Sequence, residues 1–292
     1  MDSMRMRTVF LTLALALGLP MAVPAQDKPS QEKPGVPEDL LDDEHFREEM
    51  GINELTTPSI RKIFDQLADL GPITYEDVQM QVSAPPSEDR VGVALHLGTL
   101  IANGFLSVQC ERFGDMEALG KAVLDHAQLL GTGKYLRPHS KSLLEKASLQ
   151  KTDELKKELV RTQRDIEREM ADLRDVDIAH LVSLGGWIRA FQVGSTTVNA
   201  HFTPESAAKL ARTDITGYYL AQLENLHPNI KKKEIITSLI KELGKLQEML
   251  DTPQGVPLKA EQVAAWTKQG NKLLNLIAKT KGETKPKGEG GK

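Results

Sequence analysis

VGVALHLGTLIANGFLSV, residues 91–108, and IAHLVSLGGWIRAFQV, residues 178–193, are the two stretches of the chain that decide its fold. Each has the length and composition of a helix, and each is apolar around nearly its whole circumference. A helix without a polar face belongs in the centre of a protein or in a membrane. The interior of a protein is the favoured environment for both stretches, so we predict that they form the centre of the core.

Small residues lie in the middle of both stretches. Ala94, Gly98 and Ala102 follow one another at four-residue steps, which places them on one stripe of a helix. The second stretch contains Gly185 and Gly186. A glycine inside a helix costs roughly 1 kcal/mol relative to alanine, so close packing has to compensate for it. We therefore predict that the two helices cross at these glycines.

A transmembrane helix over residues 91–108 is the alternative. About 20 apolar residues are needed to cross a bilayer. This stretch is shorter, and it contains the polar residues His96, Thr99, Asn103 and Ser107. Both features favour the core over the membrane.

The polar side chains within the two apolar stretches are the best candidates for a functional site. They are His96, Asn103, His180 and Arg189. Buried polar groups need partners. An unpaired buried arginine is costly, so we predict that Arg189 reaches solvent or meets an acid such as Asp175 or Asp177. Two interpretations stay open, a pocket for a polar or anionic ligand and a satisfied structural network, and the second is favoured.

Helix start and stop signals divide nearly all of the remaining chain into helices. Asp115 and Gly131 bound one helix, Thr203-Pro204 begins another, and residues 230–250 have the pattern of a long amphipathic one. No alternating strand pattern of convincing length occurs in the sequence. The predicted fold is all-α, an irregular multi-helix bundle of roughly eight to ten helices.

Residues 152–173 have the most regular helical pattern in the chain. Side chains that can pack recur at three- and four-residue steps, and charged residues occupy the other faces. The members of this seam are Leu155, Leu159, Thr162, Ile166, Met170 and Leu173. We predict one long, amphipathic, coiled-coil-like helix with a buried seam and exposed charged neighbours, either as an arm or as half of a helical hairpin.

The N-terminus has the pattern of a secretory signal peptide. Arg5 and Arg7 precede a short apolar run, and Val23-Pro24-Ala25 offers small residues for cleavage. We expect residues 1–25 to be removed on export to the periplasm or the exterior, with no membrane span left afterwards. Residues 26–37 are predicted to be a disordered linker and residues 281–292 a disordered Lys/Gly-rich tail. Residues 38–280 are predicted to form a single helical domain.

The net charge and the cysteine content restrict which partners the protein can bind and which disulfide bonds it can form. There are 37 Lys and Arg against 41 Asp and Glu, a net charge of −4, which argues against nucleic acid as a partner. Cys110 is the only cysteine, so an internal disulfide cannot form. Its thiol is predicted to be buried as a small apolar group, with an intermolecular disulfide as the alternative.

Catalytic and cofactor motifs do not stand out in the sequence. Acid-x-x-His pairs occur at Asp177–His180, Glu224–His227 and Asp42–His45, but the further carboxylate helices of a ferritin-like metal site are not identifiable. The Gly131–Lys134 stretch lacks the flanking residues of a P-loop. We predict no catalytic residues, no metal and no cofactor.

The predicted function is non-enzymatic. The lack of catalytic signatures and the abundance of amphipathic helices favour an exported binding or scaffolding protein of the cell envelope or exterior. Its partner would be another protein or a second copy of itself. The alternative is a small-ligand-binding protein or an enzyme that uses a polar pocket between the two apolar helices.

Overall fold

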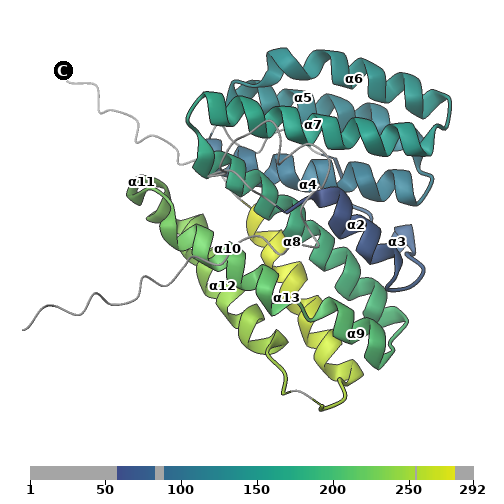
Figure 1. Ribbon diagram of the computed structural model, residues 1–292, viewed down its shortest axis with the longest axis vertical. Coiled ribbons are helices and arrows are strands. Elements are labelled where there is room, and N and C mark those ends of the chain that lie inside the picture. Colours follow the sequence, from purple (N-terminus) through teal and green to yellow (C-terminus); the bar gives the residue numbers. More distant parts are fainter. Residues whose placement is uncertain (1–57, 83–88, 254, 280–292) are drawn as a thin grey trace, which may run out of the picture. The chain divides into compact units, whose positions relative to one another are not determined.

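Helices make up the regular structure of the described part of the chain. The computed structural model describes residues 58–82, 89–253 and 255–279, and every regular element within them is a helix. Figure 1 shows these helices packed on one another as a multi-helix bundle. The all-α prediction is confirmed, and the number of helices with seven or more residues falls within the predicted range.

The α-helices follow one another along the chain from α2 to α13. Their bounds are α2 Ile60–Ala68, α3 Tyr75–Val78, α4 Arg90–Gln109, α5 Met116–Leu130, α6 Gly133–Ser148, α7 Thr152–Asp172, α8 Val176–Ala200, α9 Pro204–Leu210, α10 Thr213–Asn225, α11 Pro228–Lys231, α12 Glu234–Leu250 and α13 Ala260–Ala278. A short 3-10 helix, η2, covers Phe113–Asp115. The predicted signal peptide, linker and tail at residues 1–25, 26–37 and 281–292 lie outside the described residues.

Helices α4 and α8 cross with their backbones in direct contact. A Cβ atom added at Gly98 would lie 1.9 Å from the carbonyl oxygen of Val182 and 2.7 Å from the backbone nitrogen of Gly186. A Cβ atom added at Gly185 would lie 2.1 Å from the carbonyl oxygen of Leu95. Only glycine fits at such distances, so the predicted crossing at the glycines is confirmed.

Helix α8 lies between two groups of helices. On one side α4, α5, α6 and α7 pack successively against one another, and on the other α13, α12 and α10 do the same (Figure 1). Helices α2, α3 and α9 also pack on α8. Every residue of α8 from Ile178 to Ser195 is buried, and α4 is buried from Val91 to Val108. The two apolar stretches are therefore the centre of the core, as predicted.

Within the described residues, α4 is the one helix that has the length and hydropathy of a membrane-spanning segment. Its apolar window is 100% buried inside the protein. That environment is the one expected of a core helix whose whole circumference is apolar.

Helix α7 is the long amphipathic helix that the seam predicts, and it packs on α6 and α4. The buried members of the seam are Leu155, Leu159, Thr162, Ile166 and Met170. The prediction is wrong for Leu173, which is 51% exposed because α7 ends one residue before it, at Asp172. It is also wrong for Glu158, which is only 4% exposed because α6 covers this part of α7, and a second glutamate of this helix, Glu167, is buried as well.

Two of the predicted helix boundaries agree with the structure, and one predicted helix is interrupted. Gly131 ends α5 in the left-handed conformation with a φ of 89°. Thr203 begins α9 through a capping box with Ser206. The single helix predicted over residues 230–250 is instead divided into α11 and α12, because Lys233 takes an extended conformation and α12 starts anew after it.

Candidate functional site

The polar residues predicted to form a site are all buried, and within the described part of the chain one hydrogen bond joins two of them directly. His96, Asn103, His180 and Arg189 are 8%, 5%, 8% and 1% exposed. Asn103 and Arg189 are hydrogen-bonded to each other, whereas Nε2 of His96 lies 2.9 Å from the carbonyl oxygen of Ile277 at the end of α13. His180 is buried near the start of α8 and belongs to neither contact.

Arg189 is buried and meets no acid among the described residues, so the prediction that it reaches solvent or pairs with an acid is wrong. Its Nε atom donates to Oδ1 of Asn103 over 2.7 Å. Its two Nη atoms donate to Oε1 of Gln192 and to the carbonyl oxygen of Val78. The acids suggested as partners bond elsewhere, Asp175 with Arg90 at 2.7 Å and Asp177 with the backbone nitrogen of His227 at 2.9 Å. The guanidinium group therefore joins α3, α4 and α8 through neutral acceptors.

His96 lies beside a second buried histidine, His126 of α5. The centroids of the two rings are 6.0 Å apart, and Nδ1 of His126 lies 2.7 Å from the carbonyl oxygen of Ala122. Burial and the neighbouring His126 lower the pKa of His96 to about 4, and burial also lowers the pKa of His126. Both rings are therefore neutral at neutral pH, which fits a packed structural pair better than a charged binding site.

A cavity of about 290 Å³ lies between α2, α8, α9 and the start of α10. Its apolar lining residues are Ile63, Leu67, Leu70, Trp187, Ala190, Phe191, Ala208, Leu210 and Ile215. Its polar lining residues are Gln66, Asp69, Lys209 and Arg212, and none of these is buried. Except for Ala208, the apolar ones are buried. The interior of the cavity is thus apolar, and the polar side chains lie at its mouth.

The aromatic wall of the cavity is held in place by further rings behind it. The ring centroids of Trp187 and Phe191 are 5.6 Å apart, and those of Trp187 and Tyr219 are 5.2 Å apart. The hydroxyl of Tyr219 is in turn hydrogen-bonded to Oγ of Ser183 at 2.8 Å. Because these contacts fix Trp187 from behind, the wall is formed before any ligand arrives.

Gly194 lets the leucines of neighbouring elements close around the cavity. A Cβ atom added there would lie 2.6 Å from Cδ2 of Leu67 and 3.2 Å from Cδ1 of Leu210. Both leucines line the cavity, and they occupy the space that a side chain at position 194 would take. This glycine was not selected in the sequence, where the pairing of α8 with α2 and α9 is not visible.

Charge is balanced at the mouth of the cavity. Arg212 forms two parallel hydrogen bonds with the carboxylate of Asp214, at 2.9 Å from Nε and 2.7 Å from Nη2. The hydrogen bond from Arg212 lowers the pKa of Asp214, so both groups are charged at neutral pH. The remaining charges at the mouth are those of Lys209 and Asp69, which have opposite signs. The mouth therefore has no excess of either sign.

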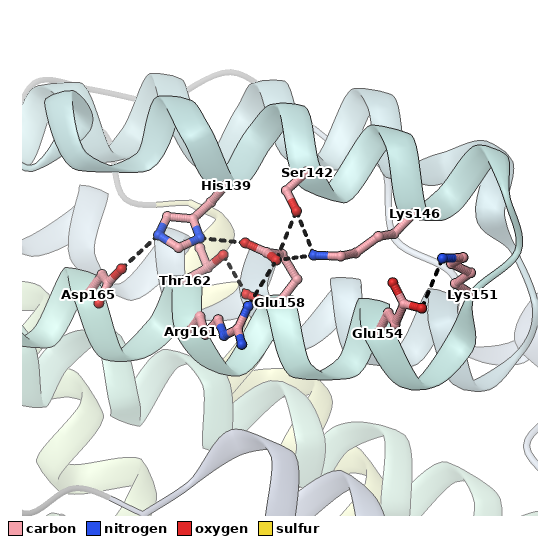
Figure 2. Close-up of polar contacts among 9 residues, drawn as sticks. All are labelled: His139, Ser142, Lys146, Lys151, Glu154, Glu158, Arg161, Thr162 and Asp165. Carbon is pink, nitrogen blue, oxygen red and sulfur yellow. Dashed lines mark hydrogen bonds and ion pairs between the residues drawn. The ribbon is translucent and has the colours of Figure 1, made fainter. Parts of the chain in front are cut away.

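A polar cluster between α6 and α7, which we call the α6–α7 clasp, was not predicted from the sequence. It consists of His139, Ser142, Lys146, Glu158 and Asp165 (Figure 2). Nδ1 of His139 lies 2.6 Å from Oε1 of Glu158, and Nε2 lies 2.7 Å from Oδ2 of Asp165. The other oxygen of Glu158 accepts hydrogen bonds from Ser142, at 2.9 Å, and from Lys146.

The α6–α7 clasp places the imidazole ring of His139 between two carboxylates, those of Glu158 and Asp165. Burial raises the pKa of Glu158, but hydrogen bonds from Lys146, His139 and Ser142 outweigh burial and leave this pKa lowered. Each ring nitrogen of His139 lies within hydrogen-bonding distance of a carboxylate oxygen, so neither is free to bind a metal ion. We interpret the α6–α7 clasp as a structural contact that holds the two helices together.

Metal ligands are not gathered in the part of the chain that the structure describes. Within it, no group of three or more His, Cys, Asp and Glu side chains could hold a metal ion. The pairs Asp177–His180 and Glu224–His227 belong to this part, whereas Asp42–His45 lies outside it.

Cys110 lies at the end of α4 and is half-buried. Burial raises the pKa of its thiol, so the thiol is protonated at neutral pH. A small packed side chain is the expected behaviour of such a thiol, and the intermolecular disulfide stays a prediction.

Comparison with known proteins finds no relative: no family model, no curated protein and no solved structure matches the chain. The function has to be inferred from the chain's own side chains.

Proposed function

We propose that the protein is an exported, non-enzymatic binding protein that holds a small molecule with an apolar body in the cavity between α2, α8, α9 and α10. The observation that carries this proposal is the cavity of about 290 Å³, with its apolar interior and its polar mouth. Ligand pockets in proteins have this character, since a few polar groups orient a mostly apolar lining. Export is inferred from the signal-peptide pattern of residues 1–25.

The size and lining of the cavity restrict the ligand. Ligand pockets span roughly 300 to 1,000 Å³, so this cavity is at the lower end and suits a compact molecule of two or three rings or a chain of similar volume. Trp187 and Phe191 present tilted rings, with an angle of 32° between their planes, against which an aromatic or aliphatic group can pack. The balanced charge at the mouth favours an uncharged ligand over an ion.

The alternative, that the protein binds another protein, has less support, because the exposed surface of the described residues offers no clear apolar docking patch. The most exposed large apolar residues among those described are Leu149, Leu173 and Val256. Leu149 precedes α7 and Leu173 follows it, so a helix of 21 residues separates them. At 1.5 Å per residue that helix is about 30 Å long. Single exposed residues this far apart are normal on a surface and do not define a docking patch.

Binding of N-phenyl-1-naphthylamine tests the proposal, because this uncharged probe fluoresces strongly only in apolar surroundings. We expect the wild-type protein to bind it at one saturable site. Ala190 lines the cavity and is fully buried, so Ala190→Phe should fill the space and abolish most of the fluorescence increase. Filling an apolar cavity usually preserves stability, and circular dichroism should show that this variant folds.

Ala118→Phe is the matched control, because Ala118 is exposed on α5 and does not line the cavity. It should bind the probe like the wild type. Octanol should displace the probe more effectively than octanoate or octylamine, in keeping with an uncharged ligand. Equal binding by the wild type and both variants, or no saturable binding by any, contradicts the proposal.

A further inference from the structure

Arg189 is a buried cation without a carboxylate partner. It is 1% exposed, and its hydrogen bonds go to an asparagine oxygen, a glutamine oxygen and a backbone carbonyl. In the part of the chain that the structure describes, no acid forms an ion pair with it. Burial lowers the pKa of the Arg189 guanidinium to about 10, so the group is still charged at neutral pH.

A lone buried charge is costly unless an opposite charge lies close to it. Neutral acceptors satisfy hydrogen bonds but leave the net charge uncompensated in a medium of low polarity. The groups that meet at Arg189 come from α3, α4 and α8, and each is neutral. A compensating negative charge at this position would therefore be strongly favoured.

Hydrogen-bond donors remain unused beside Arg189. A guanidinium group has five N–H donors, and three hydrogen bonds from Arg189 account for three of them. Nδ2 of Asn103 is buried and has no hydrogen-bond partner. Its orientation is fixed, because Nε of Arg189 donates to Oδ1 of the same amide at 2.7 Å. Spare N–H groups and a positive charge thus lie together, without an acceptor to use them.

We propose that Arg189 and Asn103 bind a small monovalent anion, either chloride or the carboxylate end of a larger molecule. The anion accepts hydrogen bonds from the amide of Asn103 and from the spare guanidinium N–H groups, and its charge neutralises Arg189. One negative charge suffices, whereas a divalent anion would leave an uncompensated charge of the opposite sign. Neither residue lines the apolar cavity, so this site is independent of the proposed function.

The bound anion would stabilise the arginine that holds a short helix against the centre of the fold. Val78, whose carbonyl accepts a hydrogen bond from Arg189, is the last residue of the four-residue helix α3. Asn103 and Arg189 belong to the crossing helices α4 and α8. An anion between them stabilises the folded protein and has no equivalent site in the unfolded chain. Its binding therefore raises stability by mass action.

The test is urea unfolding of the mature full-length chain at constant ionic strength. Chloride or formate replaces isethionate, a sulfonate too bulky for a buried site. We expect the urea midpoint to rise with chloride or formate and then to level off as the site fills. A larger rise in chloride assigns the site to a halide, and a larger rise in formate assigns it to a carboxylate.

Two variants separate the site from general salt effects. Arg189→Met removes the charge and should make the midpoint independent of the anion. Arg90→Met removes an arginine that is paired with Asp175 at 2.7 Å, and it should keep the wild-type response. If Arg189→Met does not fold, the ³⁵Cl NMR signal of a chloride solution containing the wild-type protein shows whether chloride binds. Exchange of chloride with a site on the protein broadens this signal. Equal midpoints in all three salts, together with no excess ³⁵Cl broadening, overturn the proposal.

Discussion

Gly98→Ala is the substitution to which the crossing of α4 and α8 should respond most strongly. The new methyl group would lie 1.9 Å from the carbonyl oxygen of Val182, against an ordinary contact distance of at least 3.4 Å. The obstacle is backbone, so no side-chain rotation can relieve it. The two helices would have to separate by about 1.5 Å at this point, which loosens packing along the whole contact.

The magnitude follows from two opposing effects. Alanine is the better helix former by about 1 kcal/mol. Overpacking in a core costs typically 1–3 kcal/mol and occasionally more, and a clash with rigid backbone belongs at the upper end. We expect Gly98→Ala to lower the free energy of unfolding by at least about 2 kcal/mol, measured by urea titration followed by circular dichroism.

Gly244→Ala is the matched control for this prediction. Gly244 lies in α12, and a Cβ atom added there would meet nothing within 4 Å. The gain in helix propensity should therefore appear alone and raise stability by up to about 1 kcal/mol. The reasoning is refuted if Gly98→Ala is as stable as the wild type, or if both substitutions change stability in the same direction.

Three further perturbations test the core, the α6–α7 clasp and the buried histidines. Leu159→Asp puts an unpaired charge on the buried seam and should destabilise the protein by on the order of 3 kcal/mol in urea titrations; wild-type stability would show that the seam is not core. Glu158→Gln removes the buried carboxylate of the clasp and should cost about 1–3 kcal/mol. By contrast, Glu154→Gln, which opens an exposed ion pair on the same helix, should cost less than about 1 kcal/mol; equal effects would contradict the clasp. Burial lowers the pKa of His96 from 6.5 to about 4, so the unfolded chain binds a proton in this range that the folded chain does not. The contribution of neutral His96 to the free energy of unfolding should therefore be fully present above pH 6.5. It should decrease as the pH falls towards 4, by up to about 1.36 kcal/mol per pH unit. The variant His96→Gln should show a weaker pH dependence of stability, and an unchanged slope would contradict the assignment.

The centre of the fold could be predicted from the sequence because its signals are local. An apolar circumference over 91–108 and 178–193, with glycine in the middle of each stretch, has few solutions other than two helices in close contact. The seam of α7 was predictable for the same reason up to Met170. Leu173 was assigned wrongly because the three- and four-residue pattern continues in the sequence beyond the residue at which the helix ends.

The site could not be predicted to the same extent because its contacts join distant parts of the chain. Asn103 and Arg189 are 86 residues apart and do meet, but His96 bonds to Ile277, 181 residues away. Sequence spacing indicates which polar groups are buried without indicating their partners. The cavity is harder still, since its walls come from α2, α8, α9 and α10, and its volume depends on how closely these helices pack.

Quenching of the two tryptophans by bromobenzene tests most directly whether the cavity binds apolar molecules. The protein contains Trp187 and Trp266, and Trp187 lines the cavity whereas Trp266 does not. In Trp266→Phe, which leaves Trp187 as the reporter, we expect fluorescence quenching that saturates as the cavity fills. In Trp187→Phe, which leaves Trp266, quenching should be weak and should rise linearly with bromobenzene. Linear quenching of equal strength in both variants would contradict a binding cavity at this position.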